Sequence, residues 1–202
     1  MNWKKIKQEA KEKCNGKLWD IWKPILIISF ISMIIGLIAG RIFGAESTSG
    51  NIVNSIFTLL LVPAEVGLIS YILKLVRGED YDLSELKVYY DKIGVLILIN
   101  ILVGLLTVLG CILLIIPGFI IALALTMVFY IFVDNDSLTA SEYLQRSKEM
   151  MNGYKWNYFC FCLSFIGWIL LCVLVVPVIW VVPYVTTAQA LYYEELKNVK
   201  SE

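Results

Sequence analysis

The chain has 202 residues, of which 59% are hydrophobic and only 17% are charged. Typical globular chains are about 45–50% apolar and about 25% charged, so this composition excludes an ordinary soluble domain. Lys and Arg total 17, as do Asp and Glu, so net charge favours no nucleic-acid partner. The chain has no histidine, which excludes HExxH metalloproteases and enzymes with a Ser-His or Cys-His nucleophile system.

The first expected element is a lysine-rich amphipathic helix at the N-terminus. Its apolar positions recur at helical spacing: Trp3, Ile6, Ala10, Cys14 and Leu18. It leads into "CNGKLWDIW", where Asn15, Gly16 and Trp19 form the pattern N-G-x-x-W. We expect Gly16 to stop the helix, and Lys17 and Trp19 to anchor the chain at a membrane interface.

Four apolar runs follow, and their lengths predict membrane spans. They cover residues 24–45, 52–76, 93–133 and 156–193. A bilayer core about 30 Å thick needs about 20 helical residues, so the last two runs are each long enough to cross twice. We expect them to fold back at two sets of helix breaks, Pro117 with Gly118 and Pro177 with Pro183, because proline removes a helical hydrogen bond.

The predicted fold is therefore an all-α, polytopic membrane helical bundle in a single domain, residues 1–202. Six spans form three hairpins, and the last two spans either cross fully or are re-entrant. This arrangement places 16 of the 17 Lys and Arg residues on one side and leaves only Arg41 on the other. Lys and Arg mark the cytoplasmic face, so both termini are expected in the cytoplasm.

A cytoplasmic amphipathic interfacial helix is expected before each hairpin. Residues 138–151 have helical periodicity, with Thr139 and Glu142 as a capping box and Gly153 as the C-terminal cap. Residues 83–93 repeat the periodicity before "YYDKIG", where a glycine is again expected to stop the helix.

The stretch "MMNGYKWNYF" repeats the N-G-x-x-W junction. Asn152, Gly153 and Trp156 stand at the spacing of the first junction, and Lys155 and Trp156 are the corresponding anchors. The repetition predicts three pseudo-repeats, at about residues 1–76, 77–133 and 134–202.

Glu65 is the acidic residue deepest in an apolar run, in "LLLVPAEVGL". With Arg41 and Asn100 it is the candidate intramembrane polar site. If Pro63 breaks the helix, Glu65 lies beside free amides that form ion sites in transporters. The favoured alternative is structural: Glu65 is stabilised by a helix dipole or pairs with Arg41, and Asn100 makes an interhelical hydrogen bond.

Gly36, Gly40 and Gly44 form an extended GxxxG in the first span, which permits close helix packing. Packing within the fold is favoured over packing in a dimer. The five cysteines have no metal-ligand spacing, and we expect no metal, cofactor or catalytic residue.

The third unit closely resembles a bacterial integral membrane family, domain of unknown function 975. The resemblance lies in "IPGF" and in "VFYIFVDNDSLTASEYLQRSKEMMNGYKWNYFCFCLSFIGW". The matching residues include Ile116, Pro117, Gly118, Asp134, Asn135, Ser147, Lys148, Gly153, Lys155, Gly167 and Trp168. The resemblance implies a polytopic membrane fold, distantly similar to the membrane domain of some glycerophosphodiester phosphodiesterases, and supplies no catalytic residue.

The function expected from these features is non-enzymatic: a multi-pass protein of the bacterial cytoplasmic membrane that organises lipids or a partner at the inner leaflet. Its expected partners are membrane lipids, with a partner protein or a second copy of the chain as alternatives. The rival hypothesis is a transporter or lipid-moving protein with a mid-membrane site around Glu65.

Overall fold

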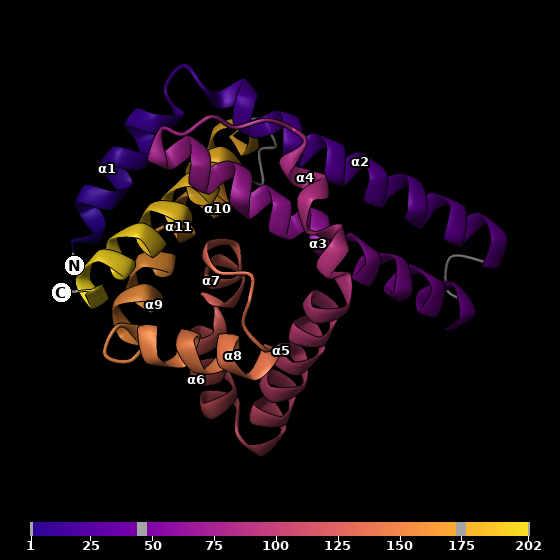
Figure 1. The fold of residues 1–202 in the computed structure, drawn as a ribbon. Helices are drawn as coiled ribbons and strands as arrows, with labels where there is room; N and C mark the ends of the chain where they lie inside the picture. Colours follow the sequence, from indigo (N-terminus) through magenta and orange to yellow (C-terminus); the bar gives the residue numbers. More distant parts are fainter. Residues whose placement is uncertain (1, 44–47, 173–176, 202) are drawn as a thin grey trace.

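A computed structural model describes residues 2–43, 48–172 and 177–201, and this part of the chain contains helices and no strand (Figure 1). The helices in chain order are α1 (Trp3–Cys14), α2 (Leu18–Phe43), α3 (Thr48–Arg77), α4 (Glu85–Val88), the 3-10 helix η1 (Tyr89–Lys92), α5 (Ile93–Leu113), α6 (Ile115–Leu125), α7 (Val128–Asp134), α8 (Ala140–Met150), α9 (Lys155–Leu163), α10 (Ile166–Leu171) and α11 (Val178–Ser201).

Four helical stretches are long and apolar enough to cross a membrane: Leu18–Phe43, Thr48–Arg77, Glu85–Leu113 and Ile116–Asp134. In their most apolar windows, only 6% of the first stretch and 17% of the third are buried inside the protein. Apolar helices left this bare need an apolar solvent, because water would make their exposure unfavourable. The chain therefore has the helices of a membrane protein.

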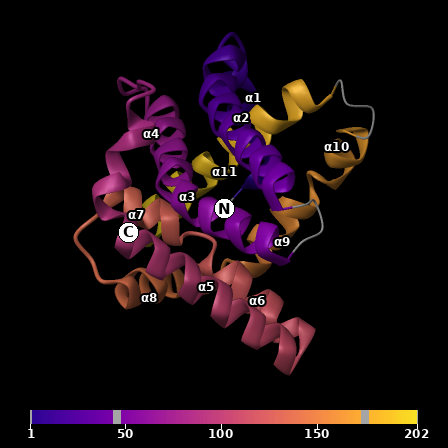
Figure 2. The ribbon, with the colours of Figure 1, turned by 90° about the vertical axis from the view of Figure 1, so that its right-hand side faces the viewer.

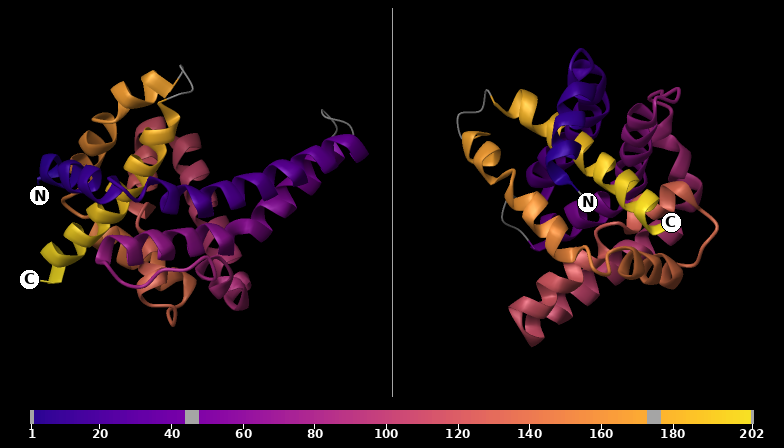
Figure 3. Two further views of the ribbon diagram at one scale, coloured as in Figure 1. Left: turned by 90° about the horizontal axis from the view of Figure 1, so that it is seen from above. Right: turned by 90° about the vertical axis from the view of Figure 1, so that its left-hand side faces the viewer.

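Three pairs of helices project from a common body. They are α2 with α3, α5 with α6, and α10 with the start of α11. The pairs splay apart: in Figure 1 the far ends of α2 and α3 point to the right and those of α5 and α6 point down, while in Figure 2 the far ends of α10 and α11 lie at the upper right and α4 and α8 lie at the left. Both termini lie at one end of the molecule, opposite the far ends of α2 and α3, as the left view of Figure 3 shows.

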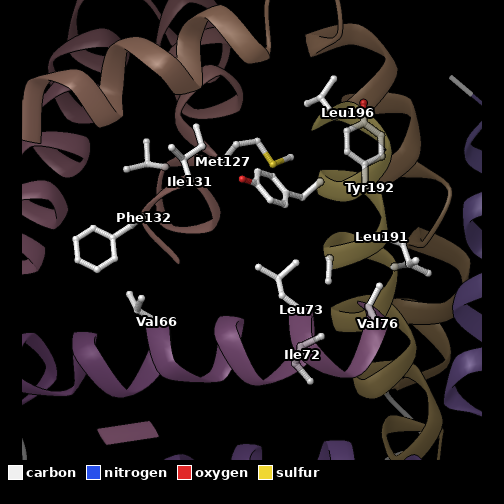
Figure 4. Packing of buried hydrophobic residues seen from close by; sticks show 14 of the residues in the cluster. Val66, Ile72, Leu73, Val76, Met127, Ile131, Phe132, Leu191, Tyr192 and Leu196 are labelled. Atoms are coloured by element: carbon white, nitrogen blue, oxygen red, sulfur yellow. The ribbon is translucent and has the colours of Figure 1, made fainter. Parts of the chain in front are cut away.

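The core lies where α3, α7 and α11 meet. Figure 4 shows buried side chains of these helices, among them Leu73 from α3, Phe132 from α7 and Tyr192 from α11. All three are fully buried and belong to one continuous cluster. Because these helices come from the first, second and third predicted repeats, the packing joins all three units.

The predicted break near Pro117 is present. Helix α5 ends at Leu113, Leu114 is extended, and α6 begins at Ile115. Gly118 allows α6 to approach α5 closely, because a Cβ there would lie only 2.5 Å from the backbone nitrogen of Cys111. Pro177 directly precedes α11, and its carbonyl accepts the first helical hydrogen bonds of that helix.

The predicted breaks at Pro63 and Pro183 are wrong. Pro63 lies inside α3, and Pro183 lies inside α11. A proline removes one backbone hydrogen bond, but flanking turns and tertiary packing can hold the helix together. Pro63 is buried with its neighbours Val62 and Ala64, so packing holds α3 continuous across it.

The glycines of α2 do not make the predicted close contact within the fold. A Cβ added at Gly40 would meet nothing within 4 Å, and one at Gly36 would meet only Asn54, at 4.0 Å. Gly44 lies outside the described residues. Close approach occurs instead at Gly67, where a Cβ would lie 2.5 Å from the carbonyl oxygen of Glu85. The glycine that allows close helix packing is therefore on α3, where α4 packs against it, and not on α2.

Candidate functional site

The two N-G-x-x-W junctions share one local structure. Gly16 has φ +80° and Gly153 has φ +84°, the left-handed conformation that ends a helix and suits glycine. The next helix begins two residues later in both cases, at Leu18 and at Lys155. The expected helix stops are thus confirmed at both sites.

The aromatic anchors of both junctions project away from the protein. Trp19 is 67% exposed and Trp156 is 73% exposed. Lys17 is exposed, with its ammonium 5.6 Å from the ring centroid of Tyr81, and Lys155 is half-buried. Each junction therefore has a lysine and an exposed indole at the start of an apolar helix.

The second junction differs from the other two. Gly94, the glycine of "YYDKIG", is the second residue of α5 and has no positive φ. The chain runs from α4 through η1 into α5 without an interruption. The expected helix stop at this glycine is therefore wrong, because Tyr89 to Lys92 continue as a 3-10 turn.

The predicted surface helices bury their apolar sides against other helices. In α1, Ile6, Ala10 and Cys14 are buried, and this helix packs along α11. In α8, Tyr143 and Leu144 are buried where the helix contacts α5 and α7. The outward sides of α1 and α8 are therefore polar.

The predicted cap of α8 is confirmed. The Glu142 carboxylate accepts hydrogen bonds from the backbone nitrogen and the hydroxyl of Thr139, each at 2.7 Å. These bonds favour the charged form and lower the pKa of Glu142.

Lysines bind the carboxyl ends of helices elsewhere in the fold. The ammonium groups of Lys7 and Lys13 donate to the backbone carbonyls of Ser164, at 3.1 Å, and Val76, at 2.7 Å. Lys200 donates to the carbonyl of Asn152, at 3.2 Å. Terminal carbonyls lack helical partners and carry the negative end of the dipole, so these lysines stabilise α9, α3 and the end of α8. Burial also lowers the pKa of Lys7.

A charge cluster joins the polar ends of α3, α7 and α11. Arg77 donates to Asp134 at 2.7 Å and to Glu194 at 2.5 Å. The second oxygen of Asp134 accepts from the hydroxyl of Tyr193, at 2.8 Å, and from Lys197, at 2.5 Å. Charge-assisted bonds of this kind are the strong ones, and here they link the helices α3, α7 and α11.

The sequence did not predict this cluster. In the sequence, Asp134 stands out only as one of the residues that match the family. Only the position of these residues in the sequence could have indicated the cluster. Arg77, Asp134 and Glu194 each follow directly after the end of an apolar run.

The candidate polar site of Glu65, Arg41 and Asn100 is not assembled. No hydrogen bond or ion pair joins any two of these residues, which lie on α3, α2 and α5. Glu65 is exposed on the outer side of α3, only five residues before Ser70, where the polar contacts of that helix begin. Because α3 is continuous at Pro63, it has no free amides beside Glu65.

No group of three or more His, Cys, Asp or Glu side chains that could hold a metal ion occurs within residues 2–43, 48–172 and 177–201. All five cysteines, at positions 14, 111, 160, 162 and 172, are free thiols.

Comparison with known families decides the classification. A family model described as protein of unknown function (DUF975) matches residues 96–200, more than half of the chain. The chain belongs to the DUF975 family. The matched part of this DUF975 protein holds α6 to α11, Asp134 and the second N-G-x-x-W junction, while Glu65 lies outside it. No curated protein and no solved structure matches the chain.

Proposed function

We propose that this DUF975 protein is a non-enzymatic, multi-pass protein of the bacterial cytoplasmic membrane that organises anionic lipids at the inner leaflet. Its three helix pairs enter the bilayer as three hairpins, of which the last is re-entrant, and both termini stay in the cytoplasm. The helices α1, α4 and α8 lie along the cytoplasmic surface, and the lysines of the junctions reach the lipid phosphates.

The observation that carries the proposal is the pair of matching junctions. Each places an exposed indole, Trp19 or Trp156, and a neighbouring lysine, Lys17 or Lys155, immediately beyond a left-handed glycine. Indoles prefer the boundary between water and acyl chains, and an ammonium group at that depth lies beside phosphate. At each junction, the lysine can therefore pair with one anionic headgroup, and the indole can pack beside the same lipid.

Two further features support lipids over a soluble ligand. Helices α2 and α5 leave their apolar surfaces bare. The apolar sides of α1 and α8 are already occupied by other helices, so the outward faces available to headgroups are polar, and that of α1 is rich in lysine.

The test is lipid selectivity after reconstitution. The protein is placed in vesicles of phosphatidylcholine with a minor fraction of phosphatidylglycerol, and spin-labelled forms of both lipids report the relative association constant. The double variant Lys17→Gln/Lys155→Gln should lower the preference for phosphatidylglycerol by a factor of about five, since each lysine near an anionic surface contributes about 1 kcal/mol.

The matched control is Lys5→Gln/Lys148→Gln, which removes the same charge from α1 and α8 away from the junctions. The control should keep most of the preference. An equal loss in both double variants, or no preference in the wild type, would contradict the proposal.

A further inference from the structure

An apolar groove lies between the first junction and the last helix pair. Its volume is about 680 Å³, within the usual range for ligand sites. It is lined by Lys11, Glu12, Cys14, Asn15, Leu18, Trp168, Leu171, Pro177, Trp180, Val181 and Tyr184. None of these residues belongs to the charge cluster at Asp134.

The walls of the groove are fixed by specific contacts. The indole nitrogen of Trp22 donates to the carbonyl of Ile179, at 2.8 Å, which ties the start of α2 to the start of α11. The thiol of Cys14 donates to the hydroxyl of Thr187, at 3.4 Å, which ties the end of α1 to α11. Burial raises the pKa of Cys14, so this thiol stays protonated and keeps its donor. The groove is thus a built feature of the fold.

The groove changes from polar to apolar along its length. Lys11, Glu12 and Asn15 lie on α1 and the link that follows it, whereas Trp168 and Trp180 lie on α10 and α11. The far ends of all three helix pairs project from the common body, and those of α10 and α11 lie at the upper right of Figure 2. If those ends enter the bilayer, the polar end of the groove lies at the headgroups and the apolar end lies among acyl chains.

The helix at the polar end of the groove carries an excess of positive charge, with five lysines against two glutamates. Lys7 and Lys13 bind helix carbonyls, whereas the ammonium group of the exposed Lys11 makes no hydrogen bond or ion pair within the described residues. Glu12 accepts from Gln8, at 3.3 Å. Lys11 is therefore the cation of the groove that is available to a ligand.

We infer that the groove binds one acyl chain of an anionic phospholipid, with the lipid phosphate beside Lys11. The chain packs against Trp168, Trp180 and Leu171, which offer the flat and aliphatic surfaces that suit a flexible hydrocarbon. This inference rests on the proposed function and makes it specific, because it assigns one lipid to a fixed site.

The test uses a phosphatidylglycerol with a photoactivatable diazirine on one acyl chain, added to the full-length protein in phosphatidylcholine nanodiscs. After irradiation, labelled residues are located by peptide mass spectrometry. The expected result is strong labelling of residues 168–184 and of the start of α2, above the background along the bare helices α2 and α5.

Two variants and two controls separate the groove from the lipid around the protein. Leu171→Trp fills the groove and should reduce groove labelling to background, whereas Leu170→Trp changes the adjacent residue, which does not line it. Lys11→Gln should reduce labelling by the phosphatidylglycerol probe about fivefold, whereas Lys5→Gln on the same helix should not.

Labelling of the groove that survives both Leu171→Trp and Lys11→Gln would overturn the inference. A phosphatidylcholine with the same diazirine serves as the headgroup control. Equal labelling by the two probes would overturn the assignment of an anionic headgroup to the groove. If the wild type keeps its lipid selectivity at the junctions while the groove is not labelled, the groove inference alone fails. If that selectivity is missing as well, the proposed function fails with it.

Discussion

Asp134 joins three helices, α3, α7 and α11. Its two oxygens bind Arg77 of α3 and Tyr193 and Lys197 of α11, and its side chain is only 14% exposed. A carboxylate this enclosed depends on its cations, because an unpaired buried charge is strongly destabilising. If this carboxylate were removed, the cations that it binds would lose an acidic partner, and Arg77 would keep only Glu194.

Asp134→Asn should therefore destabilise the protein by about 2 kcal/mol, which lowers the unfolding midpoint by about 4–8 °C for a chain of this size. The matched control is Asp136→Asn, two residues on, whose pair with Lys92 is exposed and should contribute less than about 1 kcal/mol. Thermal unfolding in detergent micelles measures both. Equal shifts for the two variants would argue against a structural role of the cluster.

Gly16 and Gly153 are required for their backbone conformation alone. Nothing lies within 4 Å of a Cβ added at either position, so a side chain there would meet no clash. Gly153→Ala and Gly16→Ala should each cost about 1–2 kcal/mol of strain in the left-handed region. Gly104→Ala, in open space inside α5, is the control and should be neutral or slightly stabilising. A neutral Gly153→Ala in the same unfolding assay would refute this account of the junction.

At the scale of elements, two contacts between helices depend on a missing side chain. Gly118 lets α6 lie against Cys111 of α5, and Gly67 lets α4 lie against α3. In both cases a Cβ would reach the backbone of the neighbouring helix, which cannot move aside as a flexible side chain can.

Gly118→Ala should therefore push α5 and α6 apart and destabilise the protein by about 1–3 kcal/mol, as overpacking does elsewhere. Gly40→Ala in α2, where a Cβ meets nothing within 4 Å, provides the control. The unfolding midpoint of each variant in micelles checks the prediction, which fails if the two substitutions have the same effect.

Helix α8 should lose its cap in acid. Hydrogen bonds from Thr139 lower the pKa of Glu142 in the folded protein. A group with a depressed folded pKa stabilises fully above its unfolded pKa and loses that contribution as the pH falls through the folded value. The difference in unfolding midpoint between wild type and Glu142→Gln should therefore be largest near pH 7 and shrink below about pH 4.5. The control is Glu149→Gln, which removes a charge from the same helix without removing the cap. If the difference in unfolding midpoint between wild type and Glu142→Gln grew in acid, the assignment of Glu142 as the cap would be contradicted.

Local signals in the sequence predicted part of these elements, and contacts between distant residues decided the rest. The left-handed Gly16 and Gly153, the cap at Glu142 and the break near Pro117 depend on a few neighbouring residues, so the sequence contains them. Packing overrode the expected breaks at Pro63 and Pro183. The cluster at Asp134 and the groove at Trp180 were not predicted, because each needs segments far apart in the chain to meet.

At the scale of the whole molecule, a compact core and bare helix pairs have different roles. The core at α3, α7 and α11 and the cluster at Asp134 hold the polar end of the three units together. Helices α2 and α5 bury little within the protein, so lipid must cover their surfaces. In the proposed topology, the far ends of the first two pairs lie on the opposite side of the membrane from α1, α4 and α8.

The accessibility of single cysteines tests this topology most directly. In a variant without the five native cysteines, a cysteine is placed at the far ends of the first two pairs (Ser49→Cys or Leu114→Cys) or at the polar end (Glu79→Cys, Ser141→Cys or Val199→Cys). A maleimide that cannot cross membranes should label the first two in intact cells and the last three only after the membrane is opened. Labelling of Ser141→Cys in intact cells, or protection of Leu114→Cys until the membrane is opened, would contradict hairpins that cross from a common cytoplasmic side.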